Sequence, residues 1–377
     1  MDAFTTPSNW QRVRLGDICE IVKGQQINKI SLNNTDKYPV INGGIDFLGY
    51  TNKFNVSKNT IAISEGGTCG YVRFMTSDFW SGGHNYSLQK ISNKVNNLCL
   101  YHILKSYEKD IMKLGVGSGL KNIQLKALKD FEILLPPLNE QAAIANILSG
   151  LDRYLYALRA LILKKESVKK ALSFELLSQR KRLKGFNQNW QRVRLGDIGK
   201  PCMCKRVMKH QTTRYGEIPF YKIGTFGNTA DAFISKKLFL EYKTKYSFPK
   251  KGDILISASG TIGRAVIYDG KPAYFQDSNI VWIDNDETLV KNDFLFYAYS
   301  NIKWNTEHTT ILRLYNDNFR NTLIPLPPLN EQIAIANILS ALDHEIISLK
   351  NKKRQFENIK KALNHDLMSA KIRVLKK

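Results

Sequence analysis

The sequence predicts an α+β protein with two mostly-β or mixed domains separated by two long antiparallel coiled-coil helices, in a pseudo-two-fold tandem repeat. Two exact repeats indicate the tandem. NWQRVRLGDI occupies residues 9–18 and 189–198, and LPPLNEQ occupies residues 135–141 and 326–332. In both copies AIANILS follows LPPLNEQ closely. Because 377 residues exceed one average domain, the repeats are best explained by a chain of several domains.

The repeats divide the chain into four parts. We predict a first domain over residues 1–137, a first spacer helix over 138–185, a second domain over 186–328 and a second spacer helix over 329–377. The spacer stretches are alike in the two copies, whereas the domains share only a few landmarks. This contrast indicates one common scaffold that carries two different domains.

Each spacer begins with a helix-start signal. The two prolines of PPLN disfavour a helix before them, and Asn139 or Asn330 is expected to cap the first turn. Glu140 and Glu331 then fall in that first turn, where the helix dipole favours a carboxylate. A long helix is therefore expected from this point in each copy.

The apolar residues of both spacers recur at alternating spacings of four and three, which is typical of a coiled-coil seam. The pattern continues less regularly through Val168 and Leu172 to about Leu183, giving a helix of ~65–70 Å at 1.5 Å per residue. Neither helix can bury this stripe alone, so we expect the two to pack against each other in antiparallel orientation. The seam consists of Ile144, Leu148, Leu151, Leu155, Leu158 and Ile162, and of Ile335, Leu339, Leu342, Ile346 and Leu349.

The two domains contain short β-rich runs punctuated by Gly, Asn and Asp. One shared landmark is GTCG at residues 67–70, which matches GTIG at residues 260–263, each directly after a predicted strand. The runs lie at residues 38–41, 60–64, 70–74, 218–223, 253–257 and 265–268.

The charge of the chain indicates an anionic partner. Lys and Arg number 56 against 33 Asp and Glu, which gives a net charge of +23 and a pI near 9.7. The excess is spread over all four parts, so a surface that follows a long polyanion explains it better than a basic tail, and nucleic acid is the commonest such partner.

No apolar stretch reaches the ~18 residues that a membrane helix needs, and the N-terminus has no hydrophobic signal segment. Five cysteines at irregular spacing argue against a disulfide framework and favour free thiols in a reducing compartment. We therefore expect a cytoplasmic protein with no membrane contact.

Enzymatic signatures are missing from the sequence. It has no G-x-x-x-x-G-K-[ST] phosphate loop, no H-E-x-x-H, no G-x-S-x-G and no N-P-P-[YF] run for holding a flipped base. Cys202-x-Cys204 with His210 is compatible with zinc, but without a second pair of ligands two incidental thiols are the preferred interpretation. We expect no catalytic residue and no metal site.

Candidate DNA contacts lie in the two domains. The turns at Gly67–Thr68 and Gly260–Thr261 either present amides and a hydroxyl to a phosphate or are hairpin turns that need positive φ, and both interpretations stay open. GVGSGLK at residues 115–121 and its counterpart TTILR at residues 309–313 offer small residues with one cation. The side chains able to contact bases or phosphates nearby are His84, Asn85, Ser118 and Lys121 in the first domain, and Arg264, Gln276, Asn279 and Arg313 in the second.

The paired LPPLNEQ and AIANILS stretches, each after a variable domain, make the chain resemble the specificity subunit of type I restriction-modification systems. The resemblance implies a non-catalytic subunit whose two target-recognition domains bind the halves of a bipartite, non-palindromic DNA sequence. It also implies two methyltransferase subunits and ATP-dependent restriction subunits as partners, with S-adenosylmethionine, ATP and Mg²⁺ bound by those partners and no cofactor bound by this chain. The implied docking region supplies Asn139, Glu140, Gln141 and Asn146, and Asn330, Glu331, Gln332 and Asn337.

Two other functions are compatible with parts of the sequence. One is a self-contained DNA methyltransferase or nuclease, against which the missing motifs count. The other is a coiled-coil scaffold with no DNA role, which the basic charge of all four parts argues against.

Overall fold

The structure, a computed structural model, describes residues 9–304, 307–308 and 312–374. The chain forms two compact units. The first unit combines residues up to Ala160 with those from Lys350 onward, and the second spans Leu161–Leu349. Each unit therefore contains one β-rich domain, part of the first long helix and part of the second.

The first domain is built on a four-stranded antiparallel sheet of order β2-β8-β5-β6 and a three-stranded sheet of order β4-β3-β7. A two-stranded ladder, β1-β11, joins the start of the domain to its end. Its elements are β1 (Gln11–Arg14), α1 (Leu15–Ile18), β2 (Glu20–Lys23), η1 (Lys29–Ser31), β3 (Tyr38–Ile41), β4 (Gly49–Thr51), β5 (Thr60–Ser64), β6 (Val72–Met75), β7 (Trp80–Ser81), β8 (Asn85–Gln89), α2 (Asn97–Ser106), α3 (Glu108–Lys113), β9 (Gly115–Val116), β10 (Asn122–Ile123), α4 (Leu125–Lys129), β11 (Glu132–Leu135) and then α5 (Leu138–Leu177).

The second domain repeats this topology, with sheets of order β13-β19-β16-β17 and β15-β14-β18 and a closing ladder β12-β22. Helix α7 is an addition that the first domain lacks. The elements are β12 (Gln191–Arg194), α6 (Leu195–Ile198), β13 (Gly199–Met203), η2 (Lys209–Gln211), β14 (Ile218–Tyr221), β15 (Ala232–Ile234), α7 (Lys236–Lys245), β16 (Ile254–Ser257), β17 (Ala265–Ile267), β18 (Tyr274–Phe275), β19 (Ile280–Asn285), α8 (Asn292–Tyr299), β20 (Glu307–His308), β21 (Leu312–Arg313), α9 (Asn316–Asn321), β22 (Leu323–Leu326) and α10 (Leu329–Met368).

The α+β class, the tandem repeat and the six predicted strands are confirmed. β3 and β5 have the expected bounds, while β6 begins two residues later than expected. The reason is Gly70, which has φ +83° and belongs to the turn, not to the strand.

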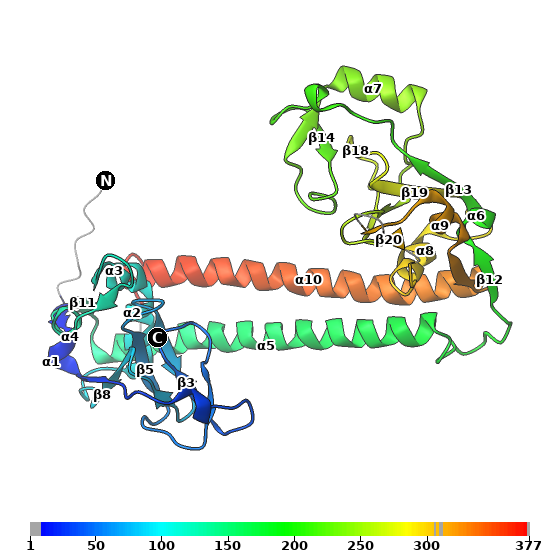
Figure 1. The fold of residues 1–377 in the computed structure, drawn as a ribbon. Helices are drawn as coiled ribbons and strands as arrows, with labels where there is room; N and C mark the ends of the chain where they lie inside the picture. The colour runs from blue at the N-terminus through cyan, green and yellow to red at the C-terminus, as the bar shows by residue number, and fades with distance from the viewer. Residues whose placement is uncertain (1–8, 305–306, 309–311, 375–377) are drawn as a thin grey trace. The chain divides into compact units, whose positions relative to one another are not determined.

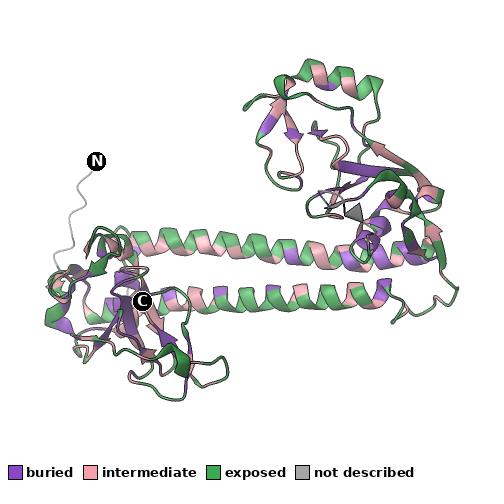
Figure 2. Cartoon of the chain, viewed as in Figure 1, coloured by how far each residue is buried: buried purple, intermediate pink, exposed green. Residues whose placement is uncertain are grey.

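The long helices α5 and α10 pair antiparallel in both units, as predicted. In the first unit Asp152 is paired with Lys360, and Arg159 is paired with Glu357 at 2.8 Å. Residue numbers rise along α5 where those of their partners fall along α10, so the two helices run in opposite directions. In the second unit the partners are Lys165 with Glu345, and Lys169 with Asp343. Buried residues recur along both helices (Figure 2). Those of the predicted seam are Ile144, Leu148, Leu155, Leu158 and Ile162, and Ile335, Leu339 and Ile346.

The helices are shorter than the prediction, and the seam is interrupted. Helix α5 ends at Leu177 and not near Leu183, because Gln179 takes φ +61° and the Lys181 amide donates back to the Glu175 carbonyl. Val168 is 45% exposed, so this expected seam position faces outward. Helix α10 closes in the same way, with Ala370 at φ +55°.

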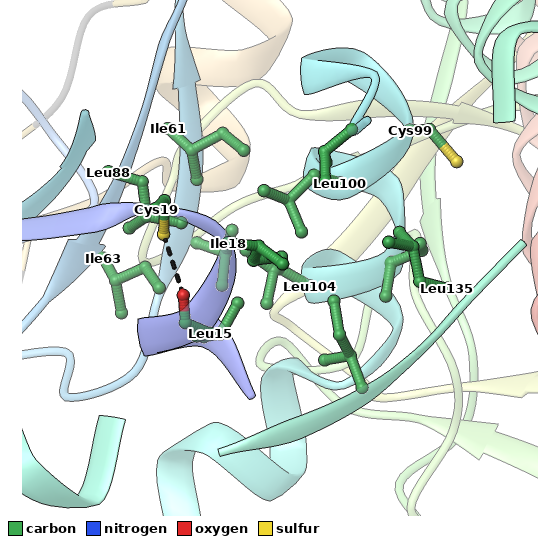
Figure 3. Close-up of a cluster of buried hydrophobic side chains, with 14 of the residues drawn as sticks. Leu15, Ile18, Cys19, Ile61, Ile63, Leu88, Cys99, Leu100, Leu104 and Leu135 are labelled. Carbon is green, nitrogen blue, oxygen red and sulfur yellow. Dashed lines mark hydrogen bonds between the residues drawn. The ribbon is translucent and has the colours of Figure 1, made fainter. Parts of the chain in front are cut away.

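The ends of the long helices belong to the domain cores. In the first unit Ile144 and Leu148 of α5 and Leu367 of α10 pack in one cluster with residues of α1, β5 and α2. Figure 3 shows part of this cluster, with the Cys19 thiol donating to the Leu15 carbonyl at 3.3 Å. In the second unit Leu176 and Leu177 of α5 and Ile335 and Leu339 of α10 pack in the core of the second domain in the same way.

Candidate nucleic-acid interface

In the first domain, four segments meet beside the glycine turn that follows β5. The Thr68 amide donates to the Gly43 carbonyl at 2.8 Å, and the Glu65 amide donates to the His84 carbonyl at 2.9 Å. The Glu65 carbonyl in turn accepts from the Ile123 amide at 2.9 Å. The loop after β3, the glycine turn, the residues before β8 and the β9-β10 hairpin therefore form one surface.

The predicted residues of the first domain lie on or near this surface. Gly67 has φ +69° and is exposed, Thr68 is half-buried, and His84 is exposed beside it. A methyl group added to the neighbouring Gly66 would lie 3.7 Å from His84 Nδ1. Ser118 and Lys121 are exposed on the hairpin. The hairpin interpretation of the turn is supported by its positive φ, and the Thr68 amide is already bonded within the chain.

Asn85 differs from the other candidates, because it is only 2% exposed. Its Oδ1 lies 3.4 Å from Ser64 Oγ, and its side chain points between the two sheets of the domain. Successive side chains of a strand point to opposite faces, and Tyr86 points into the main core. Asn85 therefore points to the other face of the sheet, which is also covered. We therefore do not retain Asn85 as a DNA contact.

The second domain repeats two of these three hydrogen bonds, those made by Glu65 in the first domain. The Ala258 amide donates to the Asn279 carbonyl, and the Ala258 carbonyl accepts from the Leu314 amide, both at 2.8 Å. Ala258 thus corresponds to Glu65, and Asn279 corresponds to His84. The backbone frame of the interface is therefore common to both domains, although the side chains on it differ.

The candidates of the second domain converge on this frame. Asn279 Oδ1 accepts from Ser259 Oγ at 2.8 Å and from the Arg313 guanidinium at 3.4 Å. Gln276 Oε1 accepts from the Ile223 amide at 3.0 Å, and Arg264 donates to the Phe226 carbonyl at 3.0 Å. Gly260, with φ +64°, and Thr261 are exposed at the turn. Of the TTILR segment, residues 309–311 lie outside the described residues.

Two residues at the first interface were missed in the sequence. Asn42 Oδ1 accepts from the His84 amide at 3.1 Å, and Asn122 Oδ1 would lie 2.3 Å from a methyl group added to Gly66. Asn122 precedes Ile123 as Arg313 precedes Leu314, so the two side chains occupy equivalent positions. A sequence alignment that matches Ile123 with Leu314, and not the cation Lys121 with the cation Arg313, would have identified Asn122.

The buried Glu65 side chain supports the first interface through an ion pair and a hydrogen bond. It is 8% exposed, pairs with Lys23 Nζ at 2.7 Å and accepts from the Tyr86 hydroxyl at 3.1 Å. Burial and the neighbouring Glu65 carboxylate raise the pKa of Tyr86 to about 12, so its hydroxyl stays a neutral donor.

At the start of α5 the predicted docking residue Gln141 is buried and bonded within its unit. Its Oε1 accepts from the Asn96 amide at 2.7 Å, and its Nε2 donates to the Pro136 and Lys94 carbonyls at 2.7 and 3.2 Å. Gln332 makes the same three bonds in the second unit, to the Lys291 amide and to the Pro327 and Leu289 carbonyls.

Glu140 is also buried, and its carboxylate accepts hydrogen bonds from residues near both ends of the chain. It accepts two bonds from the Arg373 guanidinium at 2.7 and 2.9 Å, and one from the Trp10 indole at 3.3 Å. Arg373 further donates to Asn9 at 3.4 Å. Residues near the two termini therefore meet at one carboxylate.

Glu331 repeats this arrangement in the second unit, where it is 1% exposed. It accepts from Arg182 at 2.9 and 2.8 Å and from the Trp190 indole at 2.9 Å. Because Glu140, Gln141, Glu331 and Gln332 are occupied inside the chain, we assign them a structural role in place of the predicted docking role. The repeated NEQ sequence is explained by the closure of each domain.

Comparison with known proteins decides the family. A family model described as the type I restriction modification DNA specificity domain matches residues 7–166 and 187–358. The chain belongs to this family. A Haemophilus influenzae protein described as a type I restriction enzyme specificity subunit is 40% identical over 323 residues, covering 80% of this chain and 81% of the relative.

Other members of the specificity family agree over the full length. The type I restriction enzyme MjaVIII specificity subunit of Methanocaldococcus jannaschii is 26% identical, covering 99% of this chain and 95% of its own. The crystal structure of the S subunit of a type I restriction-modification system from M. genitalium has a TM-score of 0.71 at 23% identity, covering 97% of this chain and 98% of that one. At this identity the structure supports the fold.

Of the predicted docking residues of this specificity family member, the asparagines remain accessible. Asn139 and Asn146 are exposed on α5, and Asn330 and Asn337 are exposed on α10. Asn330 lies within the first turn and does not cap it, since α10 begins at Leu329, and its Oδ1 accepts from the Glu331 amide at 2.9 Å.

Neither a metal cluster nor a membrane span was found in the described part of the chain. No group of three or more His, Cys, Asp or Glu there is placed to hold a metal ion. Cys202 and Cys204 both pack in an apolar cluster of the second domain, and burial raises the pKa of Cys204 to about 12. None of the described helices is both long and apolar enough to cross a membrane.

Proposed function

We propose that the chain recognises a bipartite, non-palindromic DNA sequence, with one half-site bound by each domain. The observation that supports this is the hydrogen-bond chain shared by the two domains. It holds different side chains at equivalent positions, with His84 and Asn122 in the first domain and Asn279 and Arg313 in the second. One backbone frame with different hydrogen-bonding side chains fits two unequal DNA words.

Within each interface we propose a division of roles. Arg313, Asn279 and Arg264 offer donors to base edges in the second domain, and His84, Asn122 and Lys121 do so in the first. The exposed turns at Gly67–Thr68 and Gly260–Thr261, together with Ser118, lie beside them and are suited to phosphate contacts. Gln276 acts by positioning, because its side chain is bonded to the Ile223 amide.

We propose that the two long helices carry the docking surfaces for two methyltransferase subunits. Asn139 and Asn146 on α5, and Asn330 and Asn337 on α10, form two similar exposed sets, as two copies of one partner require. Restriction subunits are the further partners. In this proposal the subunit is cytoplasmic and non-catalytic, with S-adenosylmethionine, ATP and Mg²⁺ bound by the partners.

The test is sequencing of adenine methylation in cells that express this chain with its methyltransferase subunits. We expect one bipartite motif, and Arg313→Ala should relax only the second word, by ~1–3 kcal/mol of discrimination. His84→Ala is the matched variant for the first word. Replacing residues 199–323 with the matching segment of a relative should change the second word alone.

Two results would contradict this proposal. If the replacement changes both words, the domains are not independent. If the purified chain methylates or cuts DNA without partners, it is a self-contained enzyme, the alternative that its missing motifs disfavour.

A further inference from the structure

The second domain carries a basic surface outside its interface. Helix α7 contributes four exposed lysines: Lys236, Lys237, Lys243 and Lys245. Its buried Phe239 anchors it to the domain core, so these lysines are held on a fixed element. Among the described residues Lys236 and Lys237 form no ion pair, whereas Lys245 is paired with Glu241. Figure 2 shows exposed residues along most of the helix.

A second basic element, the segment between β13 and β14, packs against α7. Gln211 Nε2 donates to the Tyr242 hydroxyl at 3.4 Å, and Lys205 Nζ lies 5.1 Å from the centre of the Tyr246 ring. The segment exposes Lys209 and Arg214 in addition to Lys205. The two elements therefore form one cationic surface, which we call the α7 surface.

One ion pair links the segment of the α7 surface to the loop that carries Asn279. Arg206, in the same segment, donates to Asp277 Oδ2 at 2.8 Å. Asp277 precedes Asn279 by two residues, and Asn279 lies on the interface. A duplex bound at the interface can therefore extend onto the α7 surface.

The described part of the first domain has a smaller basic surface at the equivalent place, where the segment between β2 and β3 exposes Lys29, the counterpart of Lys209, and Lys37. Residues 52–59, between β4 and β5, form no helix and contain two lysines, Lys53 and Lys58. The position equivalent to Arg206 is Gln26, whose amide would lie 2.5 Å from a methyl group added to Gly83. The lysines of α7 and the cation at Arg206 are therefore additions of the second domain, whereas Lys209 has a counterpart in the first.

We propose that the α7 surface binds the backbone phosphates of the duplex that flanks the second half-site. This inference rests on the proposed function. Lysines and arginines on a surface attract phosphates without distinguishing bases, so the surface adds affinity and salt dependence but no sequence information. The two half-sites should then differ in how far the duplex must extend beyond them.

The experiment compares two variants of the full chain, each lacking four positive charges. The first carries Lys209→Gln, Arg214→Gln, Lys236→Gln and Lys237→Gln. The matched control removes four exposed lysines of α5 and the segment after it, through Lys164→Gln, Lys170→Gln, Lys181→Gln and Lys184→Gln. Both variants have the same net charge and retain every interface residue.

Affinity is measured over a range of salt concentrations on duplexes that carry the methylated motif. One duplex ends at the second half-site, one ends at the first, and one extends ~10 base pairs, a helical turn, beyond both. For the unmodified chain we expect a loss of affinity when the flank of the second half-site is removed and little loss at the first. The α7 variant should lose this dependence, and its salt slope should fall by about 2 to 4, since each phosphate contact contributes about 0.9.

Equal salt slopes for the α7 variant and the control would overturn the proposal, as would an α7 variant that still depends on the flank. Preference for the motif over an unrelated duplex is measured in parallel. If the unmodified chain shows no preference, the proposed function has failed. If the preference holds but the flank has no effect, only the α7 inference has failed.

Discussion

The hydrogen bonds to the buried Glu331 carboxylate make the stability of the second unit sensitive to the loss of either partner. Glu331 is 1% exposed and accepts two bonds from Arg182 and one from Trp190. Truncating one partner of a buried pair leaves the other buried without compensation, which costs about 3–5 kcal/mol. We therefore expect Arg182→Ala, which leaves the buried Glu331 carboxylate without its cation, to lower the free energy of unfolding by that amount. Glu331→Ala should cost less, because the Arg182 side chain that remains is 27% exposed and can reach solvent.

A double-mutant cycle separates the pair from its surroundings. Urea unfolding of Glu331→Ala, Arg182→Ala and the double variant should give a coupling energy of about 1.5–3 kcal/mol, the range for charged hydrogen bonds. The matched control is Arg159 with Glu357, whose side chains are 59% and 36% exposed. Exposed pairs of this kind couple by about 0.2–1 kcal/mol.

The reasoning is refuted if the Glu331 pair couples no more strongly than the Arg159 pair. A loss of stability in Glu331→Ala without coupling to Arg182 would mean that the cost arises from the cavity and not from the ion pair. Glu331→Gln tests the charge itself, because it keeps the shape and an acceptor while removing the negative charge.

Three further outcomes follow from contacts in the first unit. His102 is buried and hydrogen-bonded to Ser149 at 3.2 Å, and burial lowers its pKa to about 4. The unfolded chain binds a proton at this residue near pH 6.5, whereas the folded chain does so only near pH 4. Stability should therefore fall by up to about 3 kcal/mol between pH 6.5 and 4, and denaturant titrations of His102→Gln should show a weaker fall. Because Arg373 contacts Asn9, joining the termini with a flexible linker and opening the chain near Gly185 should leave the methylated motif unchanged; a permuted chain that assembles with methyltransferase but methylates elsewhere contradicts the model. The helix pairing places Leu158 opposite residue 353. Inserting one heptad after each of these positions adds ~10.5 Å to each helix. The gap between the same two words should then lengthen. Affinity is expected to fall, because ~3 base pairs turn the duplex by roughly 100°, and any change in the words themselves refutes the spacer model.

Local patterns predicted the regular elements well. The strand at residues 60–64 and the helix that follows LPPLN could be identified because alternation, seam spacing and proline act over a few residues. The end of α5 could not, because Gln179 adopts positive φ without being a glycine, and nothing in the neighbouring residues marks it. Val168 failed for a related reason, since a seam position is buried only where a partner side chain faces it.

The polar residues were harder to interpret, because their partners are remote in sequence. Glu140 meets Trp10 across 130 positions and Arg373 across 233, and no spacing rule reaches that far. A repeated NEQ is compatible with partner docking and with internal closure, and only the hydrogen bonds distinguish them. Asn85 was chosen for its hydrogen-bonding side chain, and residue type alone does not indicate that its strand is covered on both faces.

The first unit is built from two separate stretches of the sequence, and this sets the order in which the chain can fold during synthesis. The second unit is continuous in sequence, whereas the first needs residues from Lys350 onward, including Leu367 in its core and Arg373 at Glu140. A ribosome that adds ~5–20 residues per second supplies these only after the whole of the second unit. The first domain to emerge therefore lacks Leu367 in its core and the Arg373 guanidinium at Glu140 until the second unit has been synthesised. A nascent chain released before residue 373 would leave the Glu140 carboxylate without its guanidinium partner, and this part of the first domain would be the more accessible to chaperones and proteases.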